Sequence, residues 1–297
     1  MTFPDIVALA VPVFVLMIII EMIFIKVKGR SAGRYETRDA FASLAMGFGN
    51  RIAGLVGGGA LAYGALSWVH QYRLIETIPV TAWIIVFCFV LDDLAYYWFH
   101  RIAHERRWFW ASHSVHHTSQ HYNLTTALRQ TWTGKFSFSF IFSLPLAFIG
   151  FSPEMLLFVG GINLVYQFWI HTEAIDRMGP FEWFFNTPSH HRVHHATNPE
   201  YLDANYAGTL IIWDKMFGTF IPERDEEKPR YGIIKNLGTY NPFKIAFHEW
   251  IGLFRDLKNA KSLAEVGGYL FGPPGWSPDG SRLTSAQIKQ RWQNYKK

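Results

Sequence analysis

The sequence is poor in cysteine and in charged residues. Of its 297 residues, one is cysteine and 17% are Asp, Glu, Lys or Arg, against roughly 25% charged residues in an average soluble domain. The single cysteine, Cys88, excludes an intramolecular disulfide and any metal site built from several cysteines. Because Cys88 lies in an apolar run, we interpret it as a small buried or lipid-facing residue.

The sequence also lacks a basic stripe with interleaved aromatic residues, the pattern typical of nucleic-acid binding. Its net charge of +5 comes from lysines and arginines that cluster beside apolar runs, as they do near anionic lipid surfaces. Hydrophobic residues make up 49% of the chain and aromatic residues 17%. This composition indicates an integral membrane protein without a nucleic-acid partner.

Three apolar runs predict membrane-spanning helices, at residues 5–27, about 41–69 and about 80–99. The first run has no basic leading segment and no small-residue cleavage site, which favours a membrane helix over a removed signal peptide. Basic loops stay in the cytoplasm, so the loop after this run should lie there and the amino terminus outside. The basic residues of this loop are Lys26, Lys28, Arg30, Arg34 and Arg38.

A fourth apolar stretch, residues 136–170, is interrupted by Pro145, Gly150 and Pro153. Two full spans would need roughly 40 residues plus a turn. We therefore expect a helical hairpin that enters and leaves on the same side and need not reach the far surface. The expected fold is all-α: an integral membrane helical bundle of about three spans plus this hairpin, with a cytoplasmic, histidine-rich di-metal cap.

Histidine is concentrated in the centre of the chain, where eleven of the thirteen histidines lie between positions 100 and 195. Three blocks, "HRIAH", "HSVHH" and "HRVHH", repeat the offsets i, i+4 or i, i+3, i+4. On a helix these offsets put imidazoles on one face about one turn apart, close enough to share a metal. The blocks contain His100, His104, His113, His116, His117, His191, His194 and His195.

Eight neutral imidazoles are too many for one zinc ion, which takes four ligands. They predict two metal ions with four or five ligands each, and iron, zinc, copper and nickel all accept imidazole. His171, in "QFWIHTE", ends the hairpin and is expected to re-enter the site as a ninth ligand. His190 points about 100° away from His191 on a helix, so it could bind metal or support a ligand. We interpret His121 as a surface or supporting residue and assign no role to His70 and His248.

Two carboxylates, Asp92 and Asp93, lie inside the third apolar run. Ionisable residues within a span are costly and therefore point to a function. The pair precedes His100 by about two helical turns, and metal-bound imidazoles usually donate their second N–H to a carboxylate or carbonyl. We expect at least one of the two to support the metal ligands or to accept buried hydrogen bonds. Glu105, Glu173 and Asp203 are weaker candidates for the same role.

These blocks resemble the histidine boxes of the fatty acid hydroxylase superfamily of membrane proteins, which includes sterol desaturases. The resemblance covers about residues 91–220, and within the superfamily it is closest to the monooxygenases that cleave alkylglycerol ethers. It implies a di-iron centre held by the eight boxed histidines and His171, with a tetrahydropterin or an external electron carrier as reductant. The matching segments are "DDLAYYWFHRIAHE", "WASHSVHHTSQHYNLTTALRQ", "QFWIHTE" and "NTPSHHRVHHATNPEYLDANYAGTLIIWDKMFGTF".

The expected function is that of a membrane-bound oxygenase that uses O2 to hydroxylate or desaturate a lipid, with glyceryl-ether cleavage as one such reaction. No side chain can oxidise an unactivated C–H bond, whereas two irons supplied with O2 and two electrons can. The sequence has no haem, flavin or dinucleotide fingerprint, so the electrons must come from a separate donor. Alternatives in the same superfamily are a sterol, fatty-acyl or head-group hydroxylase or desaturase.

A zinc-dependent membrane hydrolase or a metal-binding protein is the alternative from another class.

We expect the chain to divide into membrane helices at 1–79, a fatty acid hydroxylase-type catalytic domain at 80–222 and a cytoplasmic segment at 223–297. In this last segment, residues 243–258 place apolar side chains opposite charged ones at helical spacing. They predict an amphipathic helix, either on the membrane surface or packed on the cytoplasmic body.

Overall fold

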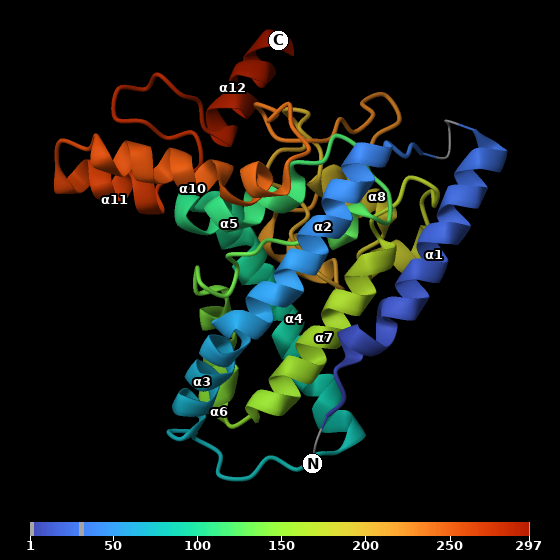
Figure 1. The fold of residues 1–297 in the computed structure, drawn as a ribbon, viewed down its shortest axis with the longest axis vertical. Coiled ribbons are helices and arrows are strands. Elements are labelled where there is room, and N and C mark those ends of the chain that lie inside the picture. The colour runs from blue at the N-terminus through green and yellow to red at the C-terminus, as the bar shows by residue number, and fades with distance from the viewer. Residues whose placement is uncertain (1–2, 30–32, 297) are drawn as a thin grey trace.

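The computed structural model describes residues 3–29 and 33–296, and Arg30 of the basic loop lies outside them. Within the described residues the secondary structure is helical, with isolated β-bridges but no strand. Figure 1 shows long helices running side by side below a cap of shorter helices and loops. The expected all-α bundle with a cap is confirmed.

Three helices are long and apolar enough to span a membrane. They are α1 (Ile6–Lys28), the kinked helical segment Thr37–His70, and α4 (Ala82–Glu105). The second consists of α2 (Thr37–Ala53), the π-helical turn η2 (Gly54–Gly58) and α3 (Gly59–His70). Gly57 has a φ of 136° in this turn, which only glycine adopts without strain. The three expected spans are therefore present.

The fourth apolar stretch forms the expected hairpin, and its tip reaches the far end of the bundle. It comprises η4 (Ser139–Ser143), α6 (Leu144–Ile149), a turn at Gly150, and α7 (Pro153–Trp169). The carbonyl oxygens of Phe148 and Ile149 accept hydrogen bonds of 2.8 and 3.1 Å from Leu74 and Ile75, in the loop between α3 and α4. The hairpin therefore extends as far as the spans beside it.

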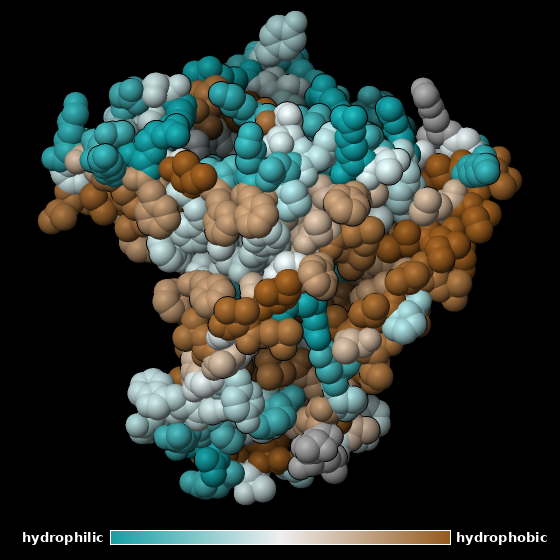
Figure 2. Space-filling view, viewed as in Figure 1, coloured by the Kyte–Doolittle hydropathy of each residue, from teal (hydrophilic) through white to brown (hydrophobic). Residues whose placement is uncertain are grey.

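The cap gathers at the opposite end of the bundle from the hairpin tip and the start of α1 (Figure 1). Arg106, with extended φ and ψ of −128° and 122°, breaks the helix between α4 and α5 and turns the chain into the cap. Figure 2 shows hydrophobic residues over the long helices and hydrophilic residues over the cap. The cap helices are α5 (Arg107–His117), η3 (Thr126–Leu128), η5 (Gly179–Trp183), α8 (Pro188–His194), α9 (Ile212–Phe217), α10 (Pro242–Lys258), α11 (Leu263–Phe271) and α12 (Ser285–Lys296).

Candidate metal centre

Nine imidazoles converge where α4 enters the cap, carried by the end of α4, by α5, by the turn that follows α7 and by α8. They form two groups, and within each group one ligand atom per residue lies within 4.8 Å of the others. The structure thus brings together every histidine that the sequence predicted as a ligand. The first group is His100, His104, His113, His117 and His194; the second is His116, His171, His191 and His195.

Backbone carbonyls fix the orientation of several of these rings. The Nδ1 atom of His100 lies 2.7 Å from the Tyr206 oxygen, and that of His171 lies 2.7 Å from the Gln167 oxygen. A carbonyl can only accept, so each Nδ1 carries the proton and donates it, which leaves the lone pair on Nε2. His116 and His194 use the oxygens of Arg129 and Ala204 in the same way, at 3.3 and 3.0 Å.

The Nε2 atoms so defined point at one another. His171 Nε2 lies 3.1 Å from the Nε2 atoms of both His116 and His191. Because the Nδ1 atoms of His171 and His116 already donate to carbonyls, their Nε2 atoms face each other lone pair to lone pair. A cation between them relieves that repulsion, so the donor set fits a metal ion. The Nε2 atoms of His104, His194 and His195 are also buried without a hydrogen-bond partner.

Burial keeps these imidazoles neutral. It lowers the pKa of His116 to about 4 and that of His194 to about 3. Both rings therefore offer a lone pair at neutral pH. Burial, followed by the charge of neighbouring imidazoles, also lowers the pKa of the other ligands that lie in the cap well below 6.5: His113, His117, His171, His191 and His195.

The remaining histidines lie outside both groups. His190 Nε2 lies 3.8 Å from Glu182 Oε2, and its ring contacts Phe220 rather than the ligands. His70 contacts the Gly150 carbonyl at the far end of the bundle, at 3.3 Å. His248, to which we assigned no role, lines a cavity that reaches the ligands.

Asp93 supports the centre through the backbone rather than through an imidazole. Its carboxylate accepts hydrogen bonds from Thr209 N, Leu210 N, Trp213 Nε1 and Asn163 Nδ2, at 2.8 to 3.0 Å. It thereby fixes the segment after Tyr206, whose carbonyl orients His100. Asp93 thus has the buried hydrogen-bonding role that was expected for one of the pair.

Two other carboxylates also support this region. Asp214 accepts the N–H groups of Tyr206 and Ala207, both at 2.8 Å, and so holds the carbonyl that orients His100. Asp203 Oδ1 lies 3.8 Å from His104 Nδ1, and its φ of 51° marks a strained backbone. Burial raises the pKa of Asp203 to about 6. Asp214 was missed because its partners lie in a loop without a periodic pattern.

Replacing Asp93 should cost more than replacing its neighbour. In Asp93→Asn, one oxygen and an NH2 group would face four donors, and each buried donor left unsatisfied costs about 1–3 kcal/mol. We expect an apparent melting temperature lower by roughly 5–10 °C and activity lower by roughly 10- to 100-fold. Asp92→Asn is the matched control, since Asp92 is the adjacent residue on the same helix, is also buried, and lies beside Gly160 rather than beside these donors. Equal losses in both variants would contradict the role of Asp93.

A cavity of about 500 Å³ reaches the ligands from the cap. His104, His117, His194 and His195 form its inner end, and Trp110 lies beside them with its ring 5.1 Å from that of His104. The carboxyl-terminal segment supplies much of the wall, so this segment belongs to the site. Its charged and polar lining includes Asp203, Lys235, His248, Glu249 and Arg282.

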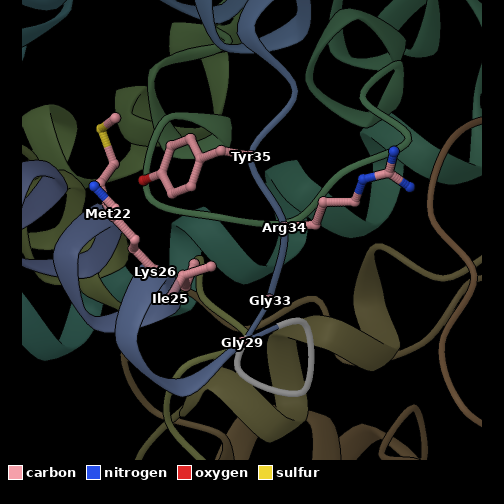
Figure 3. Close-up of a pocket in the computed structure, with 7 residues that line it drawn as sticks. All are labelled: Met22, Ile25, Lys26, Gly29, Gly33, Arg34 and Tyr35. Carbon is pink, nitrogen blue, oxygen red and sulfur yellow. The ribbon is translucent and has the colours of Figure 1, made fainter.

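A second cavity, of about 550 Å³, lies at the cap end of α1. Figure 3 shows that its polar side chains diverge, with Arg34 directed away from Tyr35 and Met22. No histidine lines it, so it takes no part in the metal centre. Its lining residues are Met22, Ile25, Lys26, Gly29, Gly33, Arg34 and Tyr35.

Comparisons with known proteins agree with the geometry. Over 281 residues, 94% of this chain, the sequence is 42% identical to the alkylglycerol monooxygenase of Xenopus tropicalis and 39% identical to that of Homo sapiens. The chain spans 61% and 62% of the length of these relatives. An ornithine lipid hydroxylase of Rhizobium tropici is 29% identical over 170 residues, 54% of this chain and 46% of that protein.

No solved structure was found to match the chain. Residues 85–219 match the sequence model of the fatty acid hydroxylase family. This range contains all nine converging histidines together with Asp93, Asp203 and Asp214. Residues 85–219 therefore form a domain of the fatty acid hydroxylase family, in a chain that is similar to alkylglycerol monooxygenases along most of its length.

Proposed function

We propose that this protein is a membrane-bound di-iron oxygenase that hydroxylates a lipid with O2, and that its substrate is a glyceryl ether. The observation that carries the proposal is the pair of imidazole groups with converging Nε2 atoms. A catalytic zinc site needs three protein ligands and one open position. Nine imidazoles in groups of five and four exceed that need and fit two ions, and iron is among the metals that imidazole binds.

The two irons would be held by the nine histidines and would supply the oxidising power for a C–H bond. The protein's own contribution is to hold and orient the imidazoles and to shield them from solvent. Carbonyls such as those of Tyr206 and Gln167 keep the imidazoles in the tautomer that presents Nε2. Burial of the ligands limits their contact with water, and the centre lies at the cap end of a membrane span, so a lipid tail would enter from the surrounding bilayer.

The cap cavity supports a small reductant rather than a carrier protein. Its volume of about 500 Å³ lies within the range of small-molecule sites, roughly 300–1,000 Å³. Exposed residues at its rim, Ile234 and Lys235, connect it to water, and its inner end is formed by the ligands themselves. A tetrahydropterin could stack on Trp110 and donate N–H groups to Asp203 or Glu249. We propose this class of donor, with a protein electron carrier as the alternative.

Metal analysis and oxygen labelling test the proposal together. Protein purified in detergent, stripped of metal and reloaded with Fe²⁺, should hold two irons per chain. Cells with and without the gene, grown under oxygen-18 gas, should differ in an alkylglycerol that accumulates without the gene. A labelled aldehyde or acid should appear with the gene present.

The other outcomes discriminate among the alternatives. A labelled hydroxy-acyl lipid, sterol or lipid head group, with ether lipids unchanged, would replace the ether substrate but keep the oxygenase. One tightly bound zinc per chain that Fe²⁺ cannot replace, together with no oxygen-dependent lipid change, would favour the hydrolase or a metal-binding protein.

The orientation in the membrane is a further part of the proposal. Lys26 and Lys28 lie in the last turn of α1, Arg34 lies between α1 and α2, and Arg38 lies in the first turn of α2. Basic segments beside a span remain in the cytoplasm. We expect the cap and its metal centre to face the cytoplasm. A reporter fused after Lys297 should be active only in the cytoplasm, and a fusion in the loop at Glu76 only outside. The reverse pattern would contradict this orientation.

A further inference from the structure

Helix α10 and the helix after it, α11, carry large apolar side chains that the described chain leaves largely exposed. On α10, Phe243 is 68% exposed, Ile251 55% and Phe254 58%, and Phe247 is also exposed. On α11, Leu263 and Phe271 are exposed to a similar or greater degree. We call the four residues of α10 the apolar stripe: Phe243, Phe247, Ile251 and Phe254.

The apolar stripe is not the face that packs α10 onto the protein. That face consists of Ile245, Ala246, Trp250 and Leu253, which are buried against α5, α2 and α11. At 100° per residue, these four lie at 200–340° from Phe243, whereas the stripe spans 0–80°. The helix therefore has two apolar faces, and folding of the chain covers one of them.

Basic residues flank the stripe on the helix. Lys258 falls within it, at about 60° from Phe243, and Lys244 and Arg255 lie just beyond it, at about 100° and 120°. All three are exposed. Apolar side chains edged by lysine and arginine are typical of helices that lie in the head-group layer of a membrane with anionic lipids.

The stripe continues the surface of a membrane span. Trp132 contacts Phe243 and Phe247, with ring centroids 5.2 and 6.1 Å apart, and its Nε1 donates to the Met46 carbonyl of α2 at 3.0 Å. On the same span Phe41 and Phe48 are each 71% exposed. Trp132 therefore joins the apolar stripe to α2, a span that itself carries exposed apolar side chains.

The orientation of α10 and α11 relative to the spans agrees with a membrane contact. Figure 1 shows α10 and α11 extending sideways from the cap, across the direction of the spans. Figure 2 shows hydrophobic residues along the edge of this projection that faces the spans, and hydrophilic residues on its opposite side. A bilayer around the spans would meet the projection on its hydrophobic edge.

We propose that α10 and α11 lie in the lipid head-group layer on the cap side of the membrane, with the apolar stripe inserted among the acyl chains and its basic flank against anionic head groups. This places the membrane surface at a defined level relative to the metal centre. Helix α10 packs against α5, which carries His113, His116 and His117, and His248 and Glu249 of α10 line the cap cavity. The membrane contact therefore positions the centre just above the acyl chains.

The single cysteine makes a direct test possible. In a Cys88→Ala background, a spin label is attached to Phe254→Cys or Ile251→Cys in the stripe, Leu16→Cys in α1 or Arg291→Cys in α12. The full chain is reconstituted in vesicles of phosphatidylcholine with or without phosphatidylglycerol. Collision with O2, which concentrates in the acyl region, is compared with collision with a water-soluble nickel complex. The readout needs neither metal nor activity, so it is independent of the proposed function.

The stripe labels should collide with O2 in preference to nickel, as the Leu16→Cys label does in its span, and phosphatidylglycerol should increase this preference. The Arg291→Cys label should favour nickel. Stripe labels as accessible to nickel as Arg291→Cys would overturn the proposal. Labels shielded from both probes, with dipolar broadening between chains, would show that a second copy covers the stripe and would also overturn it. Variants that fail to enter the vesicles are replaced by Phe243→Cys and Phe247→Cys.

Discussion

In His116→Ala, we expect the protein to lose one of the two proposed metal ions and its activity to fall by more than about 100-fold. His116 belongs to the group of four, so its removal leaves three imidazoles for that ion. Loss of a residue that merely supports a ligand costs about 10- to 100-fold, and loss of a ligand should cost more. His194→Ala should also abolish activity but leaves four ligands in its group, so more metal should remain. Iron per chain and turnover of the lipid are the two measurements.

Histidines outside the groups serve as matched controls. His70→Ala removes an imidazole that contacts the Gly150 carbonyl at the far end of the bundle, and it should retain both metals and nearly full activity.

His171→Ala tests the ninth ligand, because it too leaves three imidazoles in the second group and should behave like His116→Ala. Two metals and full activity in His116→Ala would refute the assignment of the second group.

The division of the ligands between two ions follows a rule that the sequence already contains. In each triplet the residues at i and i+4 belong to one group and the residue at i+3 to the other. Successive helical residues are 100° apart, so i+4 lies 40° to one side of i and i+3 lies 60° to the other. His113 and His117 thus fall in one imidazole group and His116 in the other, and His191 and His195 fall in one group and His194 in the other.

Other parts of the centre depend on contacts between distant segments and could not be predicted from local patterns. The donors to Asp93 at Thr209, Leu210 and Trp213 are more than 100 residues away in the chain. Hydropathy identified an apolar hairpin, but only the hydrogen bonds to Leu74 and Ile75 show how far it reaches. Periodicity likewise predicted an amphipathic α10 without revealing that it has two apolar faces.

Arg129 shows how an interaction between distant segments supports a ligand. Its side chain is 1% exposed, and its guanidinium donates to Ser43, Thr118 and Asp39, with a 2.6 Å contact to Asp39 Oδ1. Its backbone oxygen accepts from His116 Nδ1. The buried ion pair therefore ties α2, the loop after α5 and one metal ligand together.

Breaking this pair should be strongly destabilising. Arg129→Met leaves the Asp39 carboxylate buried, with the Ser119 hydroxyl as one remaining donor at 2.5 Å. Removing one partner of a buried pair costs about 3–5 kcal/mol, which corresponds to a loss of roughly 6–20 °C in apparent melting temperature. Because the Arg129 carbonyl orients His116, the second metal should also bind more weakly. Thermal unfolding in detergent and iron per chain measure the two effects.

The double variant Asp39→Leu, Arg129→Met separates loss of the pair from loss of the side chain. Replacing both partners of a buried pair by apolar residues is often neutral or stabilising, because no charge is left without a partner. We therefore expect the double variant to recover most of the stability lost in Arg129→Met, and to regain its second iron if the loop carbonyl returns to His116. A double variant as unstable as the single one would show that the guanidinium's contacts to Ser43 and Thr118, rather than its charge pair with Asp39, hold α2 against the metal centre.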